Sequence, residues 1–151
     1  GSVTGTIKDV VDEMRQAGNS IGSVSICSFR PFPMKALNQA MQHASRVVVI
    51  EKSLAVGIGG IVSTDVRMAL AGLGIPVHTI VAGLGGRAIT RASLHEVFEK
   101  AGKGALQRLT FLDMNHEVID REIERLESTR MSGPTAENIL RDLGTVADRI
   151  G

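Results

Sequence analysis

Aromatic side chains are nearly missing from this sequence of 151 residues, since they make up 3% of it, with no tryptophan and no tyrosine. A buried core must therefore be aliphatic, and single-stranded nucleic acid finds no stacking surface. An excess of one charge is also missing, because 17 basic and 16 acidic residues leave a net charge of +1. That balance provides no attraction to nucleic acid or to an anionic membrane. We therefore expect neither as a partner.

Cysteine occurs once, at Cys27, which excludes an internal disulfide and any zinc or iron–sulfur site built from several cysteines. This usage is typical of a reducing compartment and predicts a cytoplasmic location. No apolar run approaches the roughly 18 residues of a membrane-spanning helix. The N-terminus also lacks the basic and apolar regions of a secretory signal. At 43% hydrophobic residues, the composition is that of an ordinary globular domain.

Helical and strand-like patterns alternate along the first two thirds of the chain. Residues 4–17 repeat apolar side chains every three or four positions, which predicts a helix. Residues 21–28 alternate as a strand does, and we expect Cys27 to be buried there. Residues 47–50 are an unbroken apolar run, typical of a strand covered on both faces in a mostly parallel sheet. Residues 77–82 predict another strand. Further helical patterns cover residues 33–44, 62–70 and 94–101.

Short connections between these elements predict an α/β layered domain with right-handed crossovers. We assign residues 1–104 to this domain and residues 105–151 to a C-terminal extension that packs on it or on a partner. In the extension we expect a short strand over residues 109–112. A charge-dense helix should follow over residues 116–129, and an amphipathic helix over residues 139–150.

Two turns, one rich in proline and one rich in glycine, each follow an apolar, β-rich run. In Arg30-Pro31-Phe32-Pro33 the prolines end the run, and Pro33 suits the start of a helix. In Gly83-Leu84-Gly85-Gly86-Arg87 the glycines permit a sharp turn or a close approach of another chain. Arg87 can bind a carboxylate or phosphate, or pin a loop. Neither turn holds a nucleophile, an acid–base pair or a metal ligand set, so they indicate a scaffold domain of a larger enzyme.

A third glycine-rich segment, Gly57-Ile58-Gly59-Gly60, precedes a predicted helix. Backbone amides at a helix N-terminus attract phosphate, but this spacing matches neither common nucleotide-binding fingerprint. A close-packed structural turn is the favoured interpretation. The four histidines lack the spacing of a helical metal site, and no serine-hydrolase motif is present. The residues alone therefore predict no catalytic, cofactor-binding or metal-ligating side chain.

Four segments in order resemble one known domain: residues 1–11, Arg30-Pro31-Phe32-Pro33, residues 47–52 with Gly59-Gly60, and Gly83-Leu84-Gly85-Gly86-Arg87. The chain resembles, over about residues 1–90, the transketolase C-terminal-like domain in the alpha subunit of 2-oxoacid:ferredoxin oxidoreductases. The likeness is greatest to pyruvate:ferredoxin oxidoreductase. It implies a three-layer α/β/α fold with a mixed, mostly parallel sheet. The implied structural or interface residues are Arg30, Pro31, Pro33, Gly59, Gly60, Gly83, Gly85, Gly86 and Arg87.

The resemblance also implies a function for the parent enzyme. In that family the whole complex oxidatively decarboxylates pyruvate to acetyl-CoA, using thiamine diphosphate, Mg, iron–sulfur clusters and coenzyme A, and passes electrons to ferredoxin. This chain is then a non-catalytic structural and subunit-assembly domain, inactive alone. Its partners are the other domains or subunits, with a homo-oligomer as a further possibility. The alternatives are a stand-alone nucleotide- or anion-binding module at residues 57–60 and Arg87, and an interaction module docking through residues 110–150.

The sequence departs from the family pattern in two places. The family often has an aspartate after the second turn motif, where this chain has Ala88. The family domain also begins with an apolar strand before a Gly-Ser turn, whereas this sequence opens at Gly1-Ser2. These two residues are either a cloning scar or the family's own turn. In the second case we expect a gap in the sheet that the rest of the subunit fills.

Overall fold

The structure, a computed structural model, describes residues 3–128. The chain divides into two compact units at Asp113 and Met114, and each unit is described by itself. The amphipathic helix expected over residues 139–150 lies outside the described residues.

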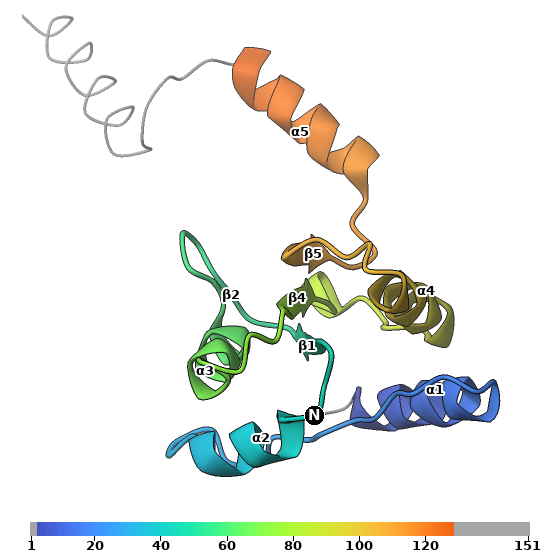
Figure 1. The fold of residues 1–151 in the computed structure, drawn as a ribbon. Coiled ribbons are helices and arrows are strands. Elements are labelled where there is room, and N and C mark those ends of the chain that lie inside the picture. The colour runs from blue at the N-terminus through green and yellow to red at the C-terminus, as the bar shows by residue number, and fades with distance from the viewer. Residues whose placement is uncertain (1–2, 129–151) are drawn as a thin grey trace, which may run out of the picture. The chain divides into compact units, whose positions relative to one another are not determined.

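Three parallel strands form the centre of the first unit (Figure 1). Their order across the sheet is β1-β4-β5, and both pairs are parallel. The register places Thr79 of β4 between Val49 of β1 and Leu109 of β5. The expected parallel sheet is therefore confirmed, and so is the short strand near residue 110. The strand bounds are β1 Val47–Glu51, β4 Val77–Val81 and β5 Leu109–Phe111.

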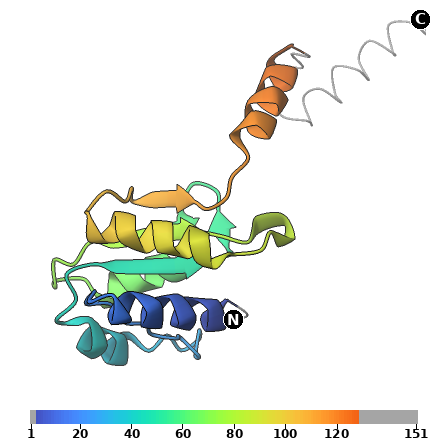
Figure 2. The same ribbon diagram turned by 90° about the vertical axis from the view of Figure 1, so that its right-hand side faces the viewer.

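Two helices cover each face of this sheet, which gives the expected three layers (Figures 1 and 2). On one face α1 packs against α4, and on the other α2 packs against α3. A two-stranded antiparallel hairpin, β2 with β3, lies between β1 and α3 in the chain. The helices are α1 Thr4–Gln16, α2 Met34–Met41, α3 Ile61–Ala69 and α4 Arg91–Gly102; the hairpin strands are β2 Leu54–Ala55 and β3 Gly59–Gly60.

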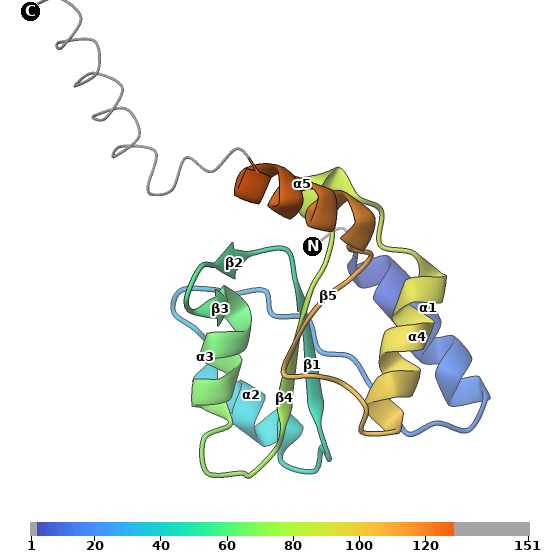
Figure 3. The ribbon, with the colours of Figure 1, turned by 90° about the horizontal axis from the view of Figure 1, so that it is seen from above.

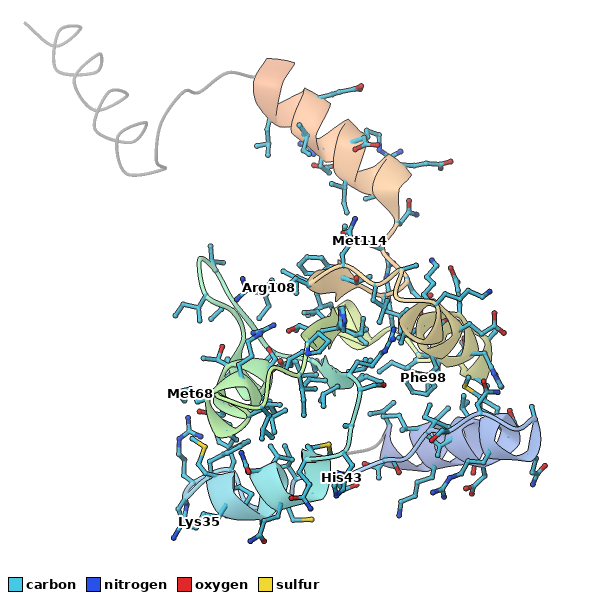
Figure 4. All side chains as sticks on the ribbon, viewed as in Figure 1. Lys35, His43, Met68, Phe98, Arg108 and Met114 are labelled. Atoms are coloured by element: carbon cyan, nitrogen blue, oxygen red, sulfur yellow. The ribbon has the colours of Figure 1, made fainter. Side chains whose placement is uncertain are left out.

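The core has two halves, one on each face of the sheet, because successive side chains of a strand point to opposite faces. Val48 and Ile50 of β1 join the half under α1 and α4. Val49 joins the half under α2 and α3. Phe98 of α4 lies between α4 and α1 (Figure 4) and belongs to the first half. The same alternation places Glu51 on the face that carries α3.

The strand expected over residues 21–28 does not form. These residues run as an irregular segment without backbone ladder bonds, and most of their side chains are exposed. Cys27, expected to be buried, is exposed as well. A strand is stabilised by hydrogen bonds to a neighbouring strand, and residues 3–128 supply none here. Figure 1 shows this segment beyond β1, on the side away from β4.

The second unit is described only for its first residues, where α5 spans His116–Ser128. This confirms the charge-dense helix expected there. Within α5, Glu122 and Arg125 form an ion pair at 3.5 Å. Among the helices of residues 3–128, none combines the length and the apolar character needed to cross a bilayer.

Candidate functional site

Ligands of open α/β sheets bind at the carboxyl ends of the parallel strands. The carboxyl edge of β1, β4 and β5 is therefore the candidate site. Figure 3 shows the hairpin of β2 and β3 at this edge, next to the start of α3. A second loop, η1 over Leu84–Gly86, follows β4. Asp113 follows β5.

Glu51, the last residue of β1, closes the N-terminus of α3. Its carboxylate accepts hydrogen bonds from the backbone amides of Val62 at 2.8 Å and Ser63 at 3.0 Å. Glu51 is 8% exposed. A carboxylate is stabilised at this position because it faces unpaired amides and the positive end of the helix dipole. An internal anion therefore occupies the position that a phosphate would take.

Gly60 permits this close approach. A Cβ atom at Gly60 would lie 2.0 Å from Glu51 Oε1 and 2.4 Å from Ser63 Oγ. Its neighbour Gly59 has φ +95°, which disfavours any L side chain. The segment at residues 57–60 is thus a close-packed structural turn. This geometry argues against the alternative of a phosphate-binding loop.

The glycine loop after β4 is also closed by contacts within the chain. Gly83, Gly85 and Gly86 all have positive φ, at 75°, 65° and 78°. An Nη of Arg87 donates to the backbone carbonyl of Asp113, after β5. The carboxylate of Asp113 in turn accepts from Ser93 Oγ at 2.9 Å. Arg87 therefore pins a loop in this structure.

Arg30 joins the proline motif to α3. Its Nη1 lies 2.8 Å from Asp65 Oδ2, where the Asp65 side chain is 8% exposed and that of Arg30 is 59% exposed. The guanidinium also stacks 4.1 Å from the ring centroid of Phe29. The Arg30–Pro31 peptide is cis. Pro33 occupies the N-cap position of α2.

The structure thus brings two of the three motifs together at α3. Gly60 immediately precedes that helix, and Asp65 within it binds Arg30. The motif at residues 83–87 is joined to Asp113 instead. Within residues 3–128 no hydrogen bond or ion pair links it to the other two motifs.

Apolar side chains are exposed at the same edge. Val56 at the tip of the hairpin is 96% exposed, and Ile58 is 70% exposed. Leu84 in the second loop is exposed as well. We call Val56, Ile58 and Leu84 the apolar rim. Their exposure at one edge of the sheet makes this edge a candidate contact surface of the first unit.

Comparison with known proteins bears on these observations. The family model described as "Pyruvate:ferredoxin oxidoreductase core domain II" matches residues 1–94. The chain belongs to this family. The expected resemblance is therefore confirmed.

Individual relatives agree with the core domain II assignment. "Pyruvate synthase subunit PorA" of Methanosarcina barkeri is 36% identical over 126 residues, covering 79% of this chain and 31% of the relative. The protein of the same name from Methanothermobacter thermautotrophicus is 34% identical, with coverages of 66% and 26%. "NADH-dependent phenylglyoxylate dehydrogenase subunit alpha" of Aromatoleum evansii is 37% identical, with coverages of 66% and 25%. The chain spans between a quarter and a third of the length of these relatives.

Sequence reasoning assigned no role to Glu51 or Asp65. In the structure both are buried: Glu51 binds the amides of α3, and Asp65 pairs with Arg30. The signal for Glu51 is its place at the end of an apolar strand, with a glycine pair before the next helix. For Asp65, no local signal exists, because its partner Arg30 is 35 positions away in the chain. Within the described residues no three histidine, cysteine or acidic side chains are placed to hold a metal ion.

Proposed function

We propose that this core domain is a structural and subunit-assembly domain of a thiamine diphosphate-dependent 2-oxoacid:ferredoxin oxidoreductase that acts on pyruvate. The whole complex would decarboxylate pyruvate oxidatively to acetyl-CoA and pass electrons to ferredoxin in the cytoplasm. Family membership and the names of the relatives support the parentage. The role of this chain within the complex rests on its own residues.

The first support is the pairing of the polar groups at the carboxyl edge. Glu51 is engaged by the amides of α3, and Asp65 is engaged by Arg30. Arg87 donates to a backbone carbonyl. A general acid or base needs a proton-bearing atom within reach of substrate, whereas these groups already serve contacts within the chain. A supporting role fits them better than chemistry.

The observation that carries the proposal is the apolar rim. Leaving Val56 at 96% exposure and Ile58 at 70% exposure in water costs free energy that burial against another surface would recover. Both residues sit on a hairpin anchored by Gly60 and by the Glu51 cap on α3. The hairpin of β2 and β3 is thus anchored at its base and exposes apolar side chains at its tip. This arrangement suits insertion between neighbouring domains or subunits.

The cofactors are assigned to other parts of the complex. An iron–sulfur cluster needs several thiolates, and this sequence holds one cysteine. Thiamine diphosphate would need a diphosphate site with Mg²⁺ ligands, usually carboxylate and carbonyl oxygens. The Glu51 carboxylate already binds the amides at the start of α3. It therefore disfavours diphosphate binding at this position, because two anions would compete for the same amides. We therefore place thiamine diphosphate, Mg, the clusters and coenzyme A outside this chain.

The free edge of β1 supports assembly in a second way. β1 is an edge of its sheet, and unpaired strand edges are normally covered or paired. Residues 21–28 run beyond that edge, with Ile21 and Ile26 packed on the two halves of the core. We propose that a strand from the rest of the subunit pairs with this edge of β1. In the assembled complex, the amides of residues 22–28 should then be protected from hydrogen exchange, but in the isolated chain they should exchange freely. Equal exchange in both would contradict this arrangement.

The decisive experiment is reconstitution of the full chain with the remaining subunits. Val56→Ser combined with Ile58→Ser should weaken co-purification and lower pyruvate-dependent ferredoxin reduction, while the circular dichroism of the isolated chain stays unchanged. Met68→Ser is the matched control, since Met68 is exposed on α3 away from the rim (Figure 4). Equal association of the rim variant and the control would refute the assembly role. Decarboxylation of pyruvate by the isolated chain would refute the non-catalytic role.

A further inference from the structure

A basic hollow lies at the opposite edge of the sheet from the apolar rim. It is an open hollow of about 460 Å³ between the end of α3, the start of β4 and the residue before β5. Arg67 and Arg108 supply its charge, and Leu70, Ile75, Pro76 and Val77 supply an apolar wall. None of the motifs discussed above contributes to it.

Arg67 is held in place by neutral groups. Its Nη2 donates to Thr79 Oγ1 at 2.6 Å, and its Nη1 lies 3.5 Å from Ser63 Oγ. Thr79 and Ser63 are both buried. No carboxylate within residues 3–128 lies within ion-pair distance of Arg67. Its guanidinium is therefore fixed in direction without having its charge neutralised by an ion pair.

Arg108 adds a second positive charge to the same hollow. It is exposed and immediately precedes β5 (Figure 4). Among the described residues its guanidinium has no hydrogen-bond or ion-pair partner. Burial lowers the pKa of Arg67, and repulsion from Arg108 lowers it further. The negative charge of Glu51 acts in the opposite direction and raises that pKa. Both arginines line the same hollow, and their like charges repel each other.

An anion would remove this imbalance. Guanidinium groups present planar, paired donors that match the oxygens of phosphate and carboxylate. A charge that is partly withdrawn from water and lacks a counterion is unfavourable, and an oxyanion between the two groups would stabilise both. The aliphatic wall would contact an apolar part of the same ligand.

We propose that Arg67 and Arg108 form a binding site for an oxyanion, a phosphate or carboxylate group carried by a small molecule. Arg67 provides the fixed donor because Thr79 orients it. Arg108 provides the adaptable donor because nothing within the described chain restrains it. The site is independent of the proposed assembly function, since it uses none of the rim residues and lies at the other edge of the sheet.

The test uses the full chain labelled with ¹⁵N, titrated with inorganic phosphate and, separately, with malonate at constant ionic strength set by chloride. Amide shifts should saturate in residues 72–75, 77–78 and 106–109. Arg108→Gln should weaken binding by about tenfold or more, because a charge-assisted hydrogen bond is lost. The control Arg15→Gln removes an exposed arginine from α1 and should leave binding unchanged.

The outcomes separate the sources of the anion. Saturation by phosphate alone would assign a phosphate-bearing ligand, and saturation by malonate alone would assign a carboxylate. The proposal is overturned if phosphate and malonate cause no amide shifts beyond those caused by chloride. It is also overturned if Arg108→Gln and the control Arg15→Gln weaken binding equally. It is also overturned if Arg108→Gln keeps full affinity while its spectrum shows an intact fold. Arg108→Lys, which keeps the charge, should bind more tightly than Arg108→Gln.

Discussion

The substitution Gly60→Ala tests the arrangement at the start of α3 directly. Gly60 has φ −71° and ψ 140°, a backbone conformation that alanine adopts without strain. Any cost must therefore come from the added methyl group. That group would stand 2.0 Å from Glu51 Oε1, so the carboxylate has to leave the N-terminus of α3.

The size of the effect follows from the bonds that are lost. The amides of Val62 and Ser63 bind the carboxylate at 2.8 Å and 3.0 Å, and a hydrogen bond to a charged group contributes about 1.5–3 kcal/mol. Water would replace part of this once the carboxylate swings outward. Reduced freedom of the unfolded chain also returns about 0.4–1 kcal/mol. We expect Gly60→Ala to lower the free energy of unfolding by about 2–4 kcal/mol.

Urea denaturation of the full chain measures this change. Circular dichroism at the helix band is the suitable signal, because the chain has no tryptophan and no tyrosine for fluorescence. Gly5→Ala is the matched control, since Gly5 lies inside α1 and a Cβ atom there meets nothing within 4 Å. That variant should be stabilised by about 0.5–1 kcal/mol.

A double-mutant cycle with Glu51→Ala isolates the clash. Without the carboxylate, the methyl group at residue 60 meets mainly the hydroxyl of Ser63. The cost of Gly60→Ala should then fall by at least about 1.5 kcal/mol. If the two substitutions were additive, or if Gly60→Ala cost nothing, the proposed contact between Glu51 and α3 would be refuted.

Three further outcomes follow from individual contacts. Asp65→Asn removes the carboxylate from its 2.8 Å pair with Arg30 and should lower the free energy of unfolding in urea by about 1 kcal/mol; an unchanged midpoint would contradict it. The exposed thiol of Cys27 should react with Ellman's reagent about as fast in the native chain as in urea, and strong native protection would show that it is covered. Lys100 binds Glu96 at 2.5 Å and, chiefly through that hydrogen bond, holds the pKa of the Glu96 carboxyl below its ordinary value. Lys100→Ala should raise that pKa in an NMR titration, and no change would exclude the pair. Because the folded-state pKa is lowered, the pair stabilises the fold above the unfolded-state pKa, and this is lost as pH falls through the folded value.

Long periodic segments were predictable from local pattern alone. The helix expected over residues 4–17 forms as α1 over Thr4–Gln16, because its apolar spacing matches the helical period. The unbroken apolar run at residues 47–50 becomes β1, covered by helices on both faces. The positive φ angles in the loop at residues 83–87 likewise follow from its glycines.

Residues 21–28 show where this reasoning failed. Their alternation is that of a strand, yet no ladder forms. Alternation describes which side chains face which way, whereas a strand also needs a neighbouring backbone to bond to. That neighbour is absent from residues 3–128, so the pattern alone could not decide the outcome.

Composition and residue spacing were enough to predict the aliphatic core, the layered α/β class and the glycine and proline turns, because these are local properties. The roles of those turns depend on how distant segments pack. Glu51 lies against α3 because strand alternation and helix placement combine, and Asp65 binds Arg30 across 35 positions of chain. Arg67 and Arg108 face one hollow because two separate crossovers return to the same edge of the sheet. Such contacts depend on the packing of distant segments, which no local pattern specifies.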